Sequence, residues 1–127
     1  MTYYFAKTLG VPLDQAVEKT VAALKSHGFG VLTKIDVKST LKEKIGADFR
    51  PYVILGACNP KMAHQALQAE DKIGTMLPCN VIVQEVDGKS EVAAVDPVAS
   101  MQAIKNDSLA AIASKVREEL KAVIQAL

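Results

Sequence analysis

An apolar run from Arg50 to Cys58 constrains the fold of this chain more than any other feature. After the arginine it reads Pro-Tyr-Val-Ile-Leu-Gly-Ala-Cys and has no polar side until its end. A half-exposed strand alternates polar and apolar residues, whereas a strand covered on both faces is apolar throughout. We therefore predict a central strand here, with neighbouring strands on each side and cover on both faces.

Further strand patterns lie on both sides of this run. Residues 2–9 are rich in aromatic and β-branched side chains and precede a glycine, which predicts a first strand. In the next candidate strand Phe29, Val31, Ile35 and Val37 share one register, with Leu32 as the exception, so one face is expected in the core. The Asp-Gly pair at positions 87–88 predicts a hairpin between strands 81–86 and 91–95.

Helix signals separate these strands. Apolar stripes, caps and a terminating glycine predict helices at 12–28 and after Asn59-Pro60, and the clearest amphipathic pattern covers 109–127. Thr40 and Glu43 have the spacing of a capping box, which predicts a short helix that starts there and ends near Gly46. Asp96-Pro97 predicts another short helix.

The resulting order is β-α-β-(α)-β-α-β-β-α, without an internal repeat or a linker. Runs of strands and helices in this order predict an α+β fold in which helices pack on one face of a mostly antiparallel sheet. We expect residues 1–127 to form a single domain of this kind.

Charge and composition exclude several classes of function. With 127 residues, fifteen basic and fourteen acidic, the chain has a net charge of +1, which argues against a partner such as nucleic acid or an anionic membrane. Hydrophobic residues make up 50% of the chain, which excludes disorder. Lys7 interrupts the first apolar residues, so we expect no signal peptide and a cytoplasmic location. No apolar run approaches the roughly twenty residues of a membrane span.

Several short motifs spread along the chain resemble the domain-of-unknown-function 302 family. They are Gly28-Phe29-Gly30-Val31, Leu55-Gly56-Ala57-Cys58-Asn59-Pro60, Ala63-His64-Gln65-Ala66-Leu67, Ile73-Gly74, Leu77-Pro78-Cys79-Asn80-Val81 and Asp96-Pro97. The resemblance implies a compact α+β domain that usually stands alone in bacteria and archaea. It also implies a homodimer, and it implies no established activity.

Five residues around two of these motifs are our candidate ligand-binding site: Cys58, Asn59, His64, Cys79 and Asn80. Cys58 directly precedes the predicted cap Asn59, where a helix N-terminus can lower the pKa of a thiol. A small buried hydrophobe at the end of a strand is the alternative for Cys58. Cys79 either joins the site or begins a strand, and His64 either leans over the strand ends or is solvated.

A metal site is not expected from the two cysteines and His64. The ligands lie six and fifteen positions apart in sequence, whereas structural zinc motifs pair ligands across two to four residues. If a parallel crossover joins the strands, the intervening helix separates Cys58 from Cys79 by on the order of 16 Å. The alternative is that residues 71–78 fold back along the helix and return Cys79 to the same edge of the sheet.

Three functions remain open. The first hypothesis is a module that binds a small molecule or ion at the Cys58-Asn59-Pro60 turn, with helix donors aimed at an anion. The second is a structural or dimerisation domain, in which these residues serve only turns and caps. The third is a thiol-based redox enzyme or sensor with Cys58 as the nucleophile. The sequence identifies no cofactor.

Overall fold

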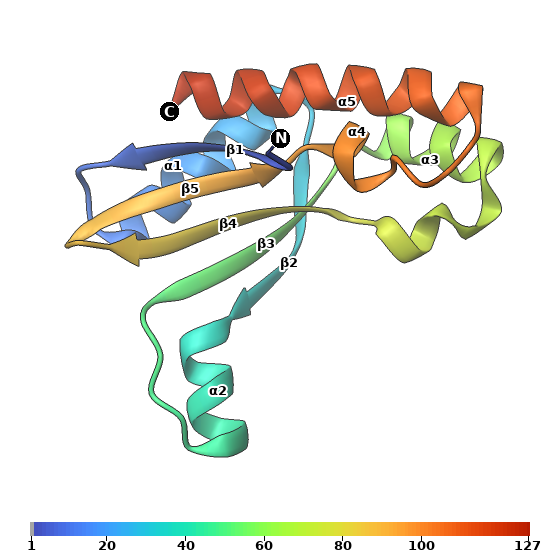
Figure 1. The fold of residues 1–127 in the computed structure, drawn as a ribbon. Coiled ribbons are helices and arrows are strands. Elements are labelled where there is room, and N and C mark those ends of the chain that lie inside the picture. The colour runs from blue at the N-terminus through green and yellow to red at the C-terminus, as the bar shows by residue number, and fades with distance from the viewer. Residues whose placement is uncertain (1) are drawn as a thin grey trace.

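Residues 2–127 are described by a computed structural model, and they form one five-stranded antiparallel sheet with helices (Figure 1). The strand order is β1-β5-β4-β3-β2. This confirms the predicted α+β class and the order of elements. The elements are β1 (Tyr4–Leu9), α1 (Leu13–Ser26), β2 (Gly30–Asp36), α2 (Val37–Ile45), β3 (Tyr52–Cys58), α3 (Pro60–Ala69), a 3₁₀ helix η1 (Asp71–Met76), β4 (Cys79–Val86), β5 (Lys89–Val95), α4 (Pro97–Ser100) and α5 (Asp107–Ala126).

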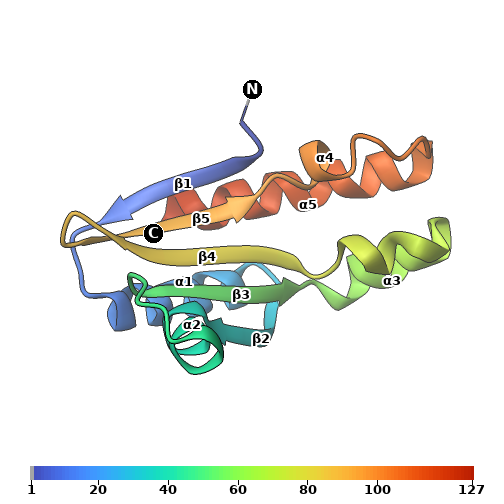
Figure 2. The same ribbon diagram turned by 60° about the horizontal axis from the view of Figure 1, so that its bottom comes forward.

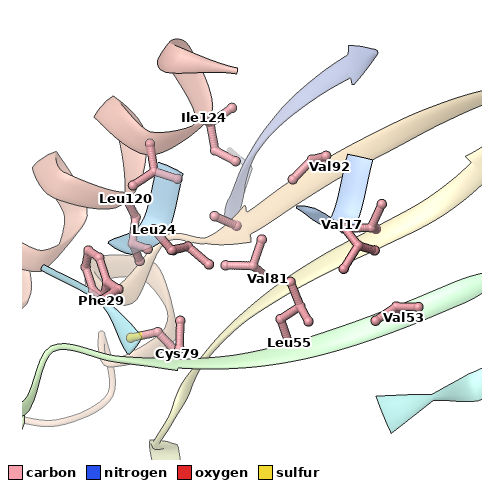
Figure 3. Packing of buried hydrophobic residues seen from close by; sticks show 14 of the residues in the cluster. Val17, Leu24, Phe29, Val53, Leu55, Cys79, Val81, Val92, Leu120 and Ile124 are labelled. Carbon is pink, nitrogen blue, oxygen red and sulfur yellow. The ribbon is translucent and has the colours of Figure 1, made fainter. Parts of the chain in front are cut away.

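Helices α1 and α5 lie together on one face of the sheet (Figure 2). The apolar stripe predicted for α5 faces the core, where Leu120 and Ile124 meet Leu24 of α1 and Val81 of β4 (Figure 3). Burying these side chains contributes roughly 1.5–3 kcal/mol each. Within residues 2–127, no helix combines the length and apolar character that a membrane crossing requires.

Strand β3 lies between β4 and β2, as expected for the apolar run. Val53 and Leu55 are buried beneath the helices, while Tyr52 and Ile54 point to the other face and stay half-buried. The prediction that both faces of β3 are covered is therefore wrong. An uninterrupted apolar run also suits a strand whose second face is open to a partner, and the residues alone do not separate these cases.

The strand predicted at 29–37 forms and Phe29 beside it is buried, but the prediction that one whole face lies in the core is wrong. Strand β2 is an edge strand, and most of its side chains are exposed, including Ile35 at 46%. The register against β3 shifts between Val31 and Thr33, so that Leu32 is the extra residue of a bulge. Val37 belongs to α2 instead of the strand. Leu32 is also the apolar residue that breaks the alternation in the sequence, and the bulge explains this exception.

The capping-box prediction for the short helix is also wrong. Helix α2 begins at Val37, and the Asp36 side chain caps it by accepting a hydrogen bond from the Ser39 amide at 3.0 Å. That bond lowers the pKa of Asp36. The predicted end is confirmed, because Gly46 adopts a φ of 67° that favours glycine.

The uncovered face of the sheet carries an apolar row across all five strands. The register places Ala6, Ala93, Ile82, Ile54 and Ile35 opposite one another in succession. We call these five residues the isoleucine row. Helices α1 and α5 lie on the opposite face, so the sheet leaves this row without a covering layer (Figure 2).

Candidate functional site

A cavity lies where β3 ends and β4 begins, bounded by α3, α5 and the segment around α4. Its volume is about 40 Å³. We call it the thiol cavity, because both cysteines of the chain line it. The lining residues used below are Phe29, Cys58, Asn59, Met62, Cys79 and Met101.

Antiparallel pairing brings the two cysteines to the same edge of the sheet. Cys79 is the first residue of β4 and lies opposite Ala57, so Cys58 is only one position further along β3. The separation of about 16 Å expected for a parallel crossover is wrong. The alternative holds, because α3 runs outward and η1 brings the chain back (Figure 1).

The two thiols differ in their surroundings. Cys79 is only 8% exposed and belongs to the hydrophobic core beside Phe29 (Figure 3). Burial raises the pKa of Cys79 to about 11, and the charge on Cys58 adds to this increase. Cys58 is half-buried, and both thiols are free. Near neutral pH Cys79 is therefore a protonated thiol, which is a poor nucleophile.

Asn59 confirms the predicted helix start, but it also occupies the donors there. Its side-chain oxygen accepts a hydrogen bond from the Met62 amide at 3.1 Å, and Pro60 has no N–H. Apart from Asn59, the cavity lining consists of apolar residues and the two thiols. The expected anion site at this helix start therefore has few free donors.

His64 and Asn80 are not part of the cavity lining. His64 is exposed on α3, which agrees with the solvated interpretation. Asn80 follows Cys79 directly, and the alternation of side chains along a strand turns it to the uncovered face. Of the five candidate residues, the fold brings together Cys58, Asn59 and Cys79.

Met62 and Met101 line the cavity and were missed as candidates. The sequence patterns assign Met62 to the inner stripe of its helix and Met101 to the core. Met62 lies in the first half of α3, and Met101 follows α4 directly. A helical stripe predicts that such a side chain is covered, but no local signal indicates which distant side chains share its environment.

Gly56 keeps the entry of β4 close to β3 at this site. A Cβ atom on Gly56 would lie 2.2 Å from Thr33 Oγ1 and 2.8 Å from Pro78 Cγ. Both distances are shorter than a Cβ atom tolerates, so a larger residue at position 56 would force the Thr33 or Pro78 side chain to move. Pro78 itself lines the thiol cavity beside Cys79.

Comparisons with known proteins bear on this geometry. The family model "Domain of unknown function DUF302" matches residues 5–127. The chain belongs to the DUF302 family. A crystal structure of an uncharacterized conserved DUF302 protein from Bacillus stearothermophilus is similar, with a TM-score of 0.92 and 28% sequence identity over 98% of each chain. A comparison with curated proteins gives no match.

Family membership confirms the resemblance seen in the motifs, and it confirms the fold of this DUF302 chain. The name of the family records no activity. Within residues 2–127, no three His, Cys, Asp or Glu side chains gather as a group of metal ligands.

Proposed function

We propose that this DUF302 domain is a binding module that holds a small ligand in the thiol cavity. The observation that carries the proposal is an apolar cavity between the sheet edge and two helices, with Cys58 and Cys79 among the residues that line it. Ligand sites of proteins are concave, mostly apolar, and carry few polar groups. The domain would act in the cytoplasm, where a reducing environment keeps both thiols free.

The size and lining of the cavity limit the class of ligand. A cavity needs roughly 10–15 Å³ to hold one water, so a volume of about 40 Å³ admits a ligand of only a few atoms unless side chains move. Among the lining residues, only Asn59, Cys58 and Cys79 carry an amide or a thiol, and all the others are apolar. Small apolar or polarizable ligands therefore suit the cavity better than the anion that the helix start suggested.

The same lining favours binding over catalysis. Apart from Cys58 and Cys79, none of the residues that line the cavity is titratable. General acid–base catalysis needs a group whose pKa lies near the working pH, and the raised pKa of Cys79 moves it away from that range. Redox chemistry at the half-buried Cys58 is the enzymatic alternative.

Xenon tests whether the cavity accepts a ligand. Amide NMR spectra of the reduced protein under xenon pressure should show shifts at residues that line the cavity, because xenon enters apolar cavities. The Ala63→Leu variant fills space at the lining and should abolish these shifts. Ala111→Leu adds the same volume at an exposed position of α5 and should preserve them. A wild-type spectrum without shifts at the lining residues would contradict the proposal.

A structural role as a homodimer is the second candidate, and the isoleucine row favours it. The neighbouring row is polar, with Arg50 Nε donating to Gln84 Oε1 at 2.8 Å and Gln84 Nε2 donating to Glu91 Oε1 at 2.9 Å. An apolar centre with a polar rim is typical of protein interfaces. The rim carries charges of both signs, so a second copy of this chain can face it without net repulsion.

A further inference from the structure

A larger hollow lies on the uncovered face of the sheet, apart from the thiol cavity. Its volume is about 380 Å³, and the lining residues used below are Tyr3, Tyr4, Tyr52, Glu91 and Ala93. We call it the alanine groove. Binding sites for small molecules typically measure roughly 300–1,000 Å³. The groove therefore has the size of a ligand site, and the function proposed for the thiol cavity does not use it.

The sizes of neighbouring side chains explain why the groove forms at this place. In the isoleucine row, the adjacent strands β1 and β5 carry alanine, whereas β4, β3 and β2 carry isoleucine. Every second residue of a strand lies on the same face, so Glu91 and Val95 flank Ala93 along β5, and Tyr4 lies opposite Val95. A short side chain among longer ones leaves a hollow. Most of the apolar surface available to the proposed homodimer belongs to the three isoleucines, which leaves the alanine half for a ligand.

Aromatic side chains form much of the groove wall. All three tyrosines of the chain line it. Tyr3 and Tyr4 form an edge-to-face pair with ring centroids 5.1 Å apart. The Asp96 amide donates a hydrogen bond to the Tyr3 carbonyl at 2.7 Å, which anchors this pair to the sheet. Both rings are exposed, so they offer aromatic surface on which the ring of a ligand can pack.

The charge of the groove selects a cationic ligand. Among residues 2–127, Glu91 is the one that gives the groove lining a charge. Its Oε1 atom accepts a hydrogen bond from Gln84 Nε2 at 2.9 Å, and a carboxylate has a second oxygen with which to accept from a ligand. The neighbouring Arg50 is held outside the lining, where its Nε donates to Gln84 Oε1 at 2.8 Å and its Cζ lies 5.5 Å from the centre of the Tyr52 ring. Tyrosine rings also attract cations, so the carboxylate and the rings favour the same charge.

We propose that the alanine groove binds an arylalkylamine, which is an aromatic ring joined to an ammonium group by a short chain. The ring packs against Tyr3 and Tyr4, the chain crosses Ala93, and the ammonium group pairs with Glu91. Val95, which lies opposite Tyr4, is four positions from Glu91 on β5, a distance of about 13 Å along a strand. The ligand is therefore elongated. This site goes beyond the function proposed for the thiol cavity and does not depend on it.

A titration with three probes that share one skeleton tests the charge of the ligand. Phenylbutylamine, phenylbutanol and phenylbutanoate carry a positive, a neutral and a negative group on the same ring and chain. In amide NMR spectra of the protein, the amine should shift the signals of Tyr4, Glu91 and Ala93. It should bind about fivefold more tightly than the alcohol, as expected for a partly exposed ion pair. The carboxylate should bind more weakly than the alcohol, because Glu91 repels it.

Two variants separate the contribution of charge from that of shape. Glu91→Gln removes the charge and should bind the amine and the alcohol equally. Ala93→Leu fills the groove and should abolish the shifts with all three probes. Glu43→Gln removes the same charge at an exposed position of α2, and Ala111→Leu adds the same volume at an exposed position of α5. Both controls should titrate like wild type, and the spectra without probe show whether each variant is folded.

Several outcomes would overturn the site. Wild type that shows no shift with the amine, or that binds the amine and the alcohol equally, would contradict it. Shifts that fall on residues of the thiol cavity would also do so, as would a folded Glu91→Gln variant that still prefers the amine or a folded Ala93→Leu variant that still binds it. The xenon experiment on the thiol cavity is independent of these results, so either proposal can fail without the other.

Discussion

Cys79 begins β4, belongs to the hydrophobic core and is one of the residues that line the thiol cavity. Its neighbour Asn80 points to the opposite face, although both residues belong to one short motif of the sequence. A motif therefore marks a turn or strand start without stating which of its side chains share a site. Asn59 was the easier residue to predict, because an N-cap depends only on the next few positions.

The raised pKa of Cys79 predicts a loss of stability at high pH. Between its ordinary value of 9.0 and about 11, the unfolded chain gives up the thiol proton while the folded chain keeps it. The stabilisation is therefore complete below about pH 9 and is lost as pH rises toward 11. Over this window the free energy of unfolding should fall by about 2–3 kcal/mol from this group alone.

Urea unfolding of wild type and Cys79→Ala across this pH range measures the effect. Other groups also titrate there, so the quantity of interest is the difference between the two proteins, which should shrink as pH rises. Cys58→Ala is the control, because it removes only the smaller cause of the shift. Parallel pH profiles for wild type and Cys79→Ala would contradict the assignment.

At the scale of elements, helices α5 and α2 differ most in how many of their residues are buried. Helix α5 buries six residues along its apolar stripe and was the clearest pattern in the sequence. Helix α2 has no buried residue, and the sequence suggested a start that the structure does not show. One hydrogen bond of ordinary length, from the Ser39 amide to Asp36, caps α2, whereas α5 is stabilised by its buried residues. An amphipathic pattern predicts a helix well only where the apolar face of that helix is buried against the rest of the protein.

Helix α2 should therefore open more readily than the rest of the chain. Amide hydrogen exchange should be faster in α2 than in the middle turns of α1 and α5, because few buried contacts resist local opening. Asp36→Ala removes the cap and should accelerate exchange in α2 alone, without a change in global unfolding.

Asn106→Ala is the matched comparison, since Asn106 caps α5 and also donates to the Ala69 carbonyl at 2.8 Å. That variant should lower global stability by about 1 kcal/mol, as expected for the loss of a cap in a packed helix. Equal effects of the two substitutions on global unfolding would show that α2 is coupled to the core more tightly than its burial indicates.

For the whole molecule, the feature with the largest consequence is that helices cover one face of the sheet only. The layer of α1 and α5 provides one hydrophobic core, and the isoleucine row lies outside it. An exposed apolar surface of this kind marks an interaction site in many soluble proteins. The proposed homodimer would therefore form through the open face of the whole sheet and not through any single strand or helix.

The homodimer predicts that Ile82→Lys, at the centre of the isoleucine row, shifts the solution mass from dimer to monomer. A charge buried between two sheets would be left unpaired, which an interface does not tolerate. Light scattering coupled to size-exclusion chromatography measures the mass. Leu67→Lys places the same charge at an exposed position of α3 and should leave the dimer intact. A monomeric wild type would contradict the proposal.

The sequence by itself determined the order of elements, most helix boundaries, the hairpin and the α+β class, because these depend on local periodicity, caps and turns. It also directed attention to the turn after β3 and to Cys79. Only the tertiary structure decided that η1 returns Cys79 to Cys58, that Met62 and Met101 join them, and that one face of the sheet stays open. These features depend on how distant segments pack, and a local pattern records whether a side chain is covered but not which residues cover it.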